Sequence, residues 1–176
     1  MLTTIVLAAR ESFSPSPPPE AMQKLVRTLA ALVPLAVGGF LGEVILAGPA
    51  GAAMARLADE AGCGLATGTG LGEVLAAALA KASRRWTLIL AAGIAPDSGF
   101  ADEAADFMVA GGDRAALLRE APESFLARLF PDIAPVAGLL VASNRLPPEP
   151  RGDLPGLARQ IRPAAKTLRV RARRLL

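Results

Sequence analysis

The side chains that most often carry out catalysis are scarce in this sequence, which limits the chemistry open to it. The 176 residues contain no histidine and a single cysteine, Cys63. Zinc sites of the histidine–cysteine type and histidine-based catalytic triads are therefore excluded, and no internal disulfide can form. Carboxylates are the groups left for metal binding or proton transfer.

A group of acids follows the apolar segment WTLILAA, residues 86–92. Asp102, Glu103 and Asp106 have the spacing of a helix start, where the helix dipole favours negative charge. We interpret these three as a solvated first turn rather than a metal site. Asp97 is the acid nearest to the end of the apolar segment, and we keep it as a candidate catalytic acid.

Two glycine-containing loops could contact phosphate. The stretch TGTGLGE, residues 67–73, has Glu73 where a dinucleotide-binding loop needs its third glycine, so that motif is excluded. Gly68 and Gly70 precede a predicted helix, whose free N–H groups attract anions. A tight turn that requires glycine is the other interpretation, and both also apply to GPAG at residues 48–51. Neither loop is a Walker A motif.

The order of predicted elements indicates an α/β fold with a central, mostly parallel sheet. Apolar runs at residues 4–9, 43–47 and 86–92 predict interior strands covered on both faces, and residues 63–67 predict a weaker strand. Helical periodicity is clear in the segments between these strands. These helices are predicted at residues 20–35, 52–62 and 72–83 and after Asp97.

The second half of the chain is harder to interpret. Residues 113–130 have a helical pattern on both sides of Pro122, and residues 136–143 fit either a strand or a buried turn. The end alternates apolar residues with Arg169, Arg171 and Arg173, which predicts a strand with one arginine face. That alternation disfavours a membrane-surface helix there. The scarcity of aromatic residues argues against nucleic-acid binding by the basic segment 145–176.

Taken in order, these segments resemble small bacterial family 2 glycosyltransferases of the GT-A fold. The likeness rests on TIVLAARES, LVRTLAALVPLAVGGFLGEVILAG, MARLADEAG, GTGLGEVLAAALAKASRRWTLILAAG, PVAGLLVASNRL and DLPGLARQI. It implies a Rossmann-like three-layer sandwich and one domain spanning residues 1–176. It also implies nucleotide contacts at the ends of the first strands. These implied contacts are Ala8, Arg10, Glu11, Gly48, Gly68 and Gly70.

The same resemblance implies that active-site acids have been lost. Where the family carries nucleotide-binding acids after the second strand, residues 48–53 are Gly-Pro-Ala-Gly-Ala-Ala. Where it carries the metal-binding Asp-x-Asp, this chain has Ala91, Ala92 and Gly93. Of the segment that supplies the catalytic base, only Asp153 remains, one position out of place. Mg²⁺ or Mn²⁺ is expected in the family, but we predict no metal here because alanine and glycine offer no side-chain ligand.

The sequence therefore predicts a glycosyltransferase-like protein that has lost catalysis and serves as a binding or partner subunit. Two alternatives stay open: an active, metal-independent glycosyltransferase that uses Arg or Lys instead of the metal, and a nucleotide-binding regulator. We expect a homo-oligomer or a protein partner, joined through apolar surface at residues 48–50 and 91–95, unless segment 97–135 covers it. The start of the chain has no basic leader, so the expected location is the cytoplasm.

Overall fold

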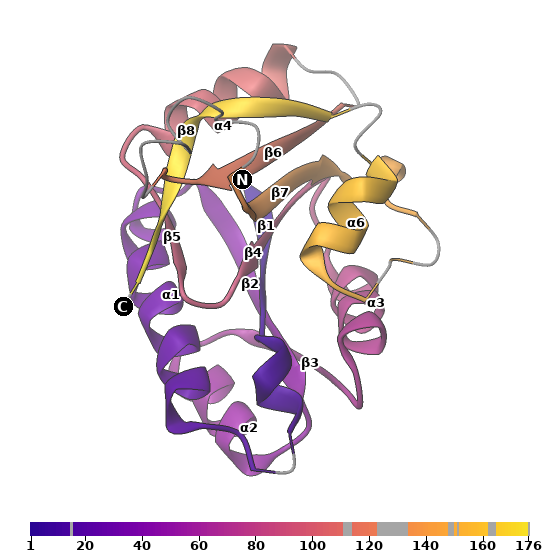
Figure 1. Cartoon of the computed structure of the whole chain (residues 1–176). Helices are drawn as coiled ribbons and strands as arrows, with labels where there is room; N and C mark the ends of the chain where they lie inside the picture. Colours follow the sequence, from indigo (N-terminus) through magenta and orange to yellow (C-terminus); the bar gives the residue numbers. More distant parts are fainter. Residues whose placement is uncertain are drawn as a thin grey trace.

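One sheet of eight strands organises the part of the chain that the computed structural model describes, residues 1–14, 16–110, 114–122, 134–147, 150, 152–161 and 165–175. The strand order is β3-β2-β1-β4-β7-β6-β8-β5 (Figure 1). The strands are β1 (Leu2–Leu7), β2 (Leu41–Pro49), β3 (Gly64–Gly68), β4 (Trp86–Ala91), β5 (Ile94–Pro96), β6 (Ala115–Glu120), β7 (Val136–Ala142) and β8 (Ala165–Arg174).

Strand direction places the ends of the first strands together. Strands β3, β2, β1 and β4 are parallel neighbours, and β6 is parallel to β8. The pairs β4–β7, β6–β7 and β5–β8 are antiparallel. The sheet is therefore mixed, with mostly parallel pairing. The carboxyl ends of β1 to β4 meet at one border of the sheet, which we call the strand-end edge.

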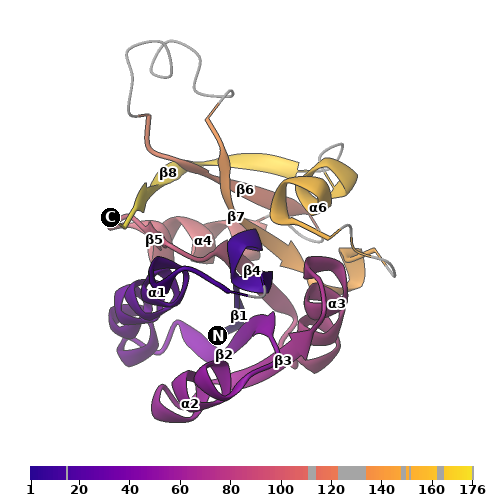
Figure 2. The same ribbon diagram turned by 60° about the horizontal axis from the view of Figure 1, so that its bottom comes forward.

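Helices cover both faces of the sheet and complete three layers. Figures 1 and 2 show α1 and α4 on one side, with α3 and α6 on the other. Buried residues form one cluster on each side, and α2 contributes to the cluster of α1 and α4. The helices are α1 (Pro19–Val37), α2 (Ala52–Glu60), α3 (Leu71–Lys81), α4 (Phe100–Ala110), α6 (Leu154–Ile161) and the short 3₁₀ turns η1 (Arg10–Phe13) and η3 (Ser143–Arg145).

The three strands predicted to be interior are confirmed as β1, β2 and β4. Their side chains alternate between the two clusters: Leu88 and Leu90 face α1 and α4, whereas Ile89 faces α3 and α6. All three residues are fully buried. Burial on both faces explains why these strands are uniformly apolar rather than alternating. In the part of the chain that the structure describes, no helix is long and apolar enough to cross a membrane.

The helical prediction for residues 113–130 is wrong in its first part. Ala115–Glu120 is strand β6, paired with β7 on one side and β8 on the other. Ala, Leu, Arg and Glu are good helix formers, but two strand neighbours and burial on both faces override that preference. Residues 123–130 lie outside the described residues. Between the two alternatives for residues 136–143, the structure has a strand, β7.

The predicted C-terminal strand is confirmed as β8. Leu168 and Ala172 are buried, whereas Arg169 and Arg173 are exposed and Arg171 is half-buried. The pairing of β8 with β6 shifts register between Leu117 and Arg119, so β8 bulges there. A bulge re-aims neighbouring side chains and N–H groups. The arginine face is therefore less regular than simple alternation predicts.

Candidate functional site

The end of β1 leads into η1, which carries two of the predicted nucleotide contacts. Arg10 is exposed and Glu11 is half-buried. Ala8 and Gly48, also predicted as contacts, are buried where β1 and β2 end. A Cβ atom on Gly48 would lie 3.1 Å from the Cβ of Ala8 and 2.7 Å from the Cε of Met54. Gly48 therefore lets Met54 of α2 pack closely against the strand ends.

A cavity of about 400 Å³ gathers three predicted site residues at the strand-end edge. Arg10, Gly70 and Asp153 line it, and we call it the Arg10 pocket. Its other lining residues are Phe13, Leu71, Gly72 and Gly152. Gly68 is not among them. The half-buried ring of Phe13 is a lining residue that the sequence analysis missed, because a phenylalanine between two serines carries no pattern.

Asp153, the candidate base, is engaged in local structure. Its Oδ1 accepts a 2.7 Å hydrogen bond from the N–H of Gly156, as a helix N-cap does, and so begins α6. Its Oδ2 lies 3.7 Å from Nη2 of Arg10, whose side chain is largely exposed. The carboxylate therefore holds the start of α6 and faces a cation. Both interactions hold the carboxylate in a fixed position.

The start of α3 is packed closely against the loop before α6. A Cβ atom on Gly72 would lie 3.3 Å from Cα of Gly152, and one on Gly152 would lie 3.1 Å from the backbone N of Gly72. Only glycine at both positions allows this approach. Nearby, Glu73 accepts hydrogen bonds of 2.8 Å from the backbone N–H and the hydroxyl of Thr69. These bonds lower the pKa of Glu73, so an internal carboxylate already lies at this helix start.

The turn after β4 is where the resemblance implies a degenerate metal site. Ala91 and Ala92 are half-buried and Gly93 is buried, with a φ of 85°. The N–H of Gly93 donates to the hydroxyl of Thr28 at 2.9 Å, and its C=O accepts from Leu175 at 2.8 Å. Helix α1 and the end of β8 thus take up the backbone groups of this turn.

The predicted apolar surface after β4 is only partly exposed, so that prediction needs correction. Ile94 and Ala95 are 3% and 1% exposed. They form strand β5, whose pairing with β8 was not predicted, and α1 packs beside them. In the described part of the chain, α1 and β8 provide this cover. The sequence did not anticipate β5 because three residues are too few to show a period.

A second cavity, of about 380 Å³, opens beside this turn, and we call it the β4-end pocket. Residues 91–94 form one wall. Its charged lining residues are Glu20, Lys24, Arg27, Glu120 and Arg174. Lys24 Nζ donates to Glu11 at 2.6 Å, and Arg174 Nη2 lies 2.7 Å from Glu120. The hydrogen bond from Lys24 lowers the pKa of Glu11, so the Glu11 carboxyl is ionised at neutral pH.

The residues at the β4 end do not fit a divalent metal. Mg²⁺ and Mn²⁺ are held by carboxylates and other oxygen donors, whereas residues 91–93 offer no side-chain donor. Among the described residues, no group of three or more His, Cys, Asp or Glu side chains could hold a metal ion. The cations Lys24, Arg27 and Arg174 line the pocket instead.

Asp97 does not join the groups at the strand-end edge. Strand β5 runs antiparallel to β8, which has the same direction as β4, so β5 leads the chain away from that edge. Three residues of strand span about 10 Å. Asp97 follows β5, and its N–H donates to the C=O of Arg171. The structure therefore separates Asp97 from Asp153 and the Arg10 pocket.

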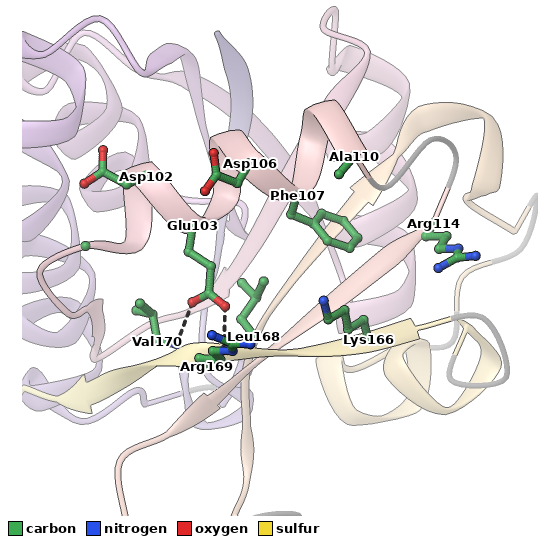
Figure 3. A pocket seen from close by; sticks show the side chains of 11 residues that line it. Asp102, Glu103, Asp106, Phe107, Ala110, Arg114, Lys166, Leu168, Arg169 and Val170 are labelled. Atoms are coloured by element: carbon green, nitrogen blue, oxygen red, sulfur yellow. Dashed lines mark hydrogen bonds between the residues drawn. The ribbon is translucent and has the colours of Figure 1, made fainter.

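The acids of α4 line a groove between α4 and β8, of about 560 Å³ (Figure 3). Glu103 accepts hydrogen bonds of 2.7 Å from the backbone N–H groups of both Arg169 and Val170, at the bulge in β8. Asp102 and Asp106 are exposed. This arrangement agrees with a solvated helix start, and Glu103 additionally satisfies two backbone N–H groups at the bulge in β8.

Comparison with known proteins identifies the fold. No protein-family model and no curated protein sequence matches the chain. Glucosyl-3-phosphoglycerate synthase from Mycobacterium tuberculosis, in complex with Mn²⁺, uridine diphosphate and glucosyl-3-phosphoglycerate, matches with a TM-score of 0.62 and 16% identity over 94% of this chain and 68% of that chain. The same enzyme with phosphoglyceric acid gives 0.59 and 17% over 94% and 69%.

A mycobacterial protein of solved structure matches with a TM-score of 0.58 and 16% identity, over 82% of this chain and 54% of that chain. The chain therefore spans between about half and two thirds of the length of these solved chains. At such identities the likeness establishes the fold alone. The chain has the GT-A fold of a glycosyltransferase, as the sequence resemblance implies.

Proposed function

We propose that this chain is a single-domain, non-catalytic GT-A protein that binds a nucleotide or nucleotide sugar at the strand-end edge. One observation supports this above all. The carboxylate left in the Arg10 pocket, Asp153, caps α6 and faces Arg10, while residues 91–93 at the end of β4 offer no carboxylate. A general base contributes about 10²–10⁴-fold to rate, so its loss removes much of the catalysis. Binding needs no such group.

The Arg10 pocket has the size and lining expected of a small-ligand site. Its volume of about 400 Å³ lies within the range of roughly 300–1,000 Å³ for such pockets. Phe13 offers an aromatic surface and Arg10 an exposed cation. The likeness to an enzyme solved with uridine diphosphate supports the choice of a uridine nucleotide as the first probe.

We predict that the protein binds uridine diphosphate but neither hydrolyses nor transfers glucose from UDP-glucose. Calorimetry measures binding, and product analysis measures turnover against a protein-free control. Phe13→Ala should weaken binding by about tenfold, because stacking on an aromatic ring contributes about 1–3 kcal/mol per base. Phe40→Ala, at a ring packed 6.1 Å from Phe100 and outside the pocket, controls for a general loss of stability.

The same measurement tests an active, metal-independent glycosyltransferase. The three cations of the β4-end pocket favour that alternative, because side-chain cations can neutralise a leaving diphosphate. Turnover above the control, lost in Asp153→Asn, would establish it and overturn the non-catalytic proposal. Binding of neither nucleotide would leave both without support. The cytoplasmic location remains a prediction from the sequence.

We also propose that the chain associates with a second copy through the outer face of α1. Val26, Val33 and Val37 are 45%, 54% and 83% exposed. No charged residue occurs between Thr28 and Gly42. Val26 and Val33 line a groove of about 470 Å³ between α1 and α2, so the groove and the exposed valines form one surface for a second copy to cover. Together these features favour self-association through the outer face of α1 rather than through the surface at residues 48–50 and 91–95 that the sequence predicted.

Sedimentation velocity at several protein concentrations tests the association. We expect a dimer that Val33→Glu converts to a monomer, since a buried unpaired charge opposes an apolar contact. Val109→Glu, on the exposed face of α4, adds the same charge elsewhere and should leave the dimer intact. A monomer at every concentration of the unmodified protein would refute self-association.

A further inference from the structure

We propose that the β4-end pocket is a metal-independent diphosphate site, in which Lys24, Arg27 and Arg174 hold the anion and Glu11 and Glu120 compete with it. The proposal rests on the proposed function for the source of the diphosphate, a nucleotide. Its physical basis is separate, because the Arg10 pocket shares none of these residues. A divalent metal is expected at this turn in the GT-A fold, whereas residues 91–93 offer no side-chain ligand for it.

The position of Lys24 depends on the missing side chain of Gly93. A Cβ atom on Gly93 would lie 3.2 to 3.5 Å from Cγ, Cδ and Cβ of Lys24. The methylene groups of Lys24 therefore lie directly over the turn. Glycine after β4 does more than remove a ligand, because it makes room for a lysine whose ammonium group reaches the strand-end edge. A lysine can hold phosphate as a point charge.

Arg174 reaches the same pocket from the other side of the turn. Figures 1 and 2 place the C-terminal end of β8 beside α1. Arg174 is paired in register with Ile94, and its side chain is 52% exposed. Glu120, its partner, has a side chain that is only 13% exposed and therefore holds the guanidinium in a fixed orientation. The remaining N–H groups of Arg174 stay available to an anion in the pocket.

Arg27 adds a cation that has no carboxylate partner in the described part of the chain. It follows Lys24 by three residues, so the two lie on neighbouring positions of the α1 surface. Arg27 is exposed, and no acid among the described residues lies within ion-pair distance of it. The backbone donors of Gly93 and Ile94 are already bonded to Thr28. Recognition of an anion here must therefore come from side chains.

The two carboxylates explain how the pocket can remain stable when empty. Each pairs with one cation, and pairs as exposed as Lys24–Glu11 contribute only about 0–1 kcal/mol. A diphosphate carries more charge than one carboxylate, and all three cations line the cavity that it would enter. It should therefore displace Glu11 from Lys24 and share Arg174 with Glu120. Removing a carboxylate should strengthen anion binding, whereas removing a cation should weaken it.

Calorimetric titration with inorganic pyrophosphate, in the presence of EDTA, tests whether the carboxylate and cation variants change the affinity in opposite directions. Lys24→Met and Arg174→Met should each weaken binding about tenfold, because bonds between charged groups are the strong ones. Glu11→Gln should strengthen binding by roughly threefold, as the competitor loses its charge. Lys166→Met, in the groove between α4 and β8, removes a charge elsewhere and should change affinity less than twofold. Thermal unfolding of each variant confirms that it is folded.

The outcomes separate this proposal from the proposed function. Pyrophosphate binding that requires Mn²⁺, or that responds equally to Lys24→Met and Lys166→Met, would overturn the diphosphate site. Weaker binding in Glu11→Gln would overturn the competition. If pyrophosphate binds as described but uridine diphosphate binds no better, the diphosphate site stands and the nucleotide proposal fails. If uridine diphosphate binds and Lys24→Met does not affect that binding, the nucleotide proposal stands and the diphosphate site fails.

Discussion

Replacing Leu90 with alanine is expected to lower the free energy of unfolding by about 2–5 kcal/mol, the range typical of leucine-to-alanine changes in protein cores. Leu90 is fully buried in β4, the strand that ends at Ala91 and at the β4-end pocket. It lies between β1 and β7, in the cluster that packs α1 and α4 onto the sheet. A cavity here cannot collapse easily, because two strands fix the backbone on either side.

Chemical denaturation of the variant, with the slope compared to that of the unmodified protein, measures the loss. Val109→Ala is the matched control, since Val109 on α4 is 88% exposed and its truncation should change stability by less than about 0.5 kcal/mol. A loss below 1 kcal/mol for Leu90→Ala would show that the centre of the sheet is loosely packed. The packing around Leu90 would then not fix the position of β4 at the β4-end pocket.

Sequence patterns predict the first half of this fold well because each element there has a strong local signal. Residues 4–9, 43–47 and 86–92 are apolar, short and bounded by turn residues, which is typical of buried strands. Strand β6 lacks such a signal, since Ala-Ala-Leu-Leu-Arg-Glu suits a helix equally well. Its neighbours β7 and β8 decide its structure. Only pairing with β7 and β8, which follow later in the sequence, makes this segment a strand rather than a helix.

The candidate site was less predictable because its main groups come from ordinary surface positions. The sequence resemblance implied lost acids at residues 91–93 and nucleotide contacts at Arg10 and Glu11. No sequence pattern distinguished Lys24, which the sequence alone predicts to be a solvated residue on the polar face of α1. The fold brings it over Gly93, 69 positions later in the chain. A cation that replaces a metal ligand can come from any element near the turn, so local spacing carries no trace of it.

The turn after β4 is held in place without a carboxylate at residues 91–93. The turn after β4 gains hydrogen bonds to Thr28 and Leu175, and Lys24 packs across it. Restoring a single acid at Ala91 would place it among cations without a second ligand. Recovery of metal binding would therefore need several changes at once.

Gly138→Ala is expected to destabilise the protein by about 1–3 kcal/mol, the range typical of overpacked cores. Gly138 of β7 is paired in register with Leu90. A Cβ atom on Gly138 would lie 2.8 Å from Cδ2 of Leu90 and 3.1 Å from the C=O oxygen of Ile89. The side chain of Leu90 is enclosed and the strand backbone is fixed, so neither neighbour can move freely. Chemical denaturation measures the effect.

Combining Gly138→Ala with Leu90→Ala tests whether this contact is the cause. Removing the Leu90 side chain removes the closer of the two clashes and opens a cavity that the new methyl group partly fills. The double variant should therefore be more stable than the sum of the single losses predicts, by about 0.5–3 kcal/mol, as for residues in contact. Gly138→Ala with Val109→Ala should instead be additive within about 0.5 kcal/mol, because the exposed Val109 side chain takes no part in the contact. Additivity in both pairs would show that the loss comes from the clash with the Ile89 backbone. Strand pairing, more than the packing of the Leu90 side chain against β7, would then fix the position of β4.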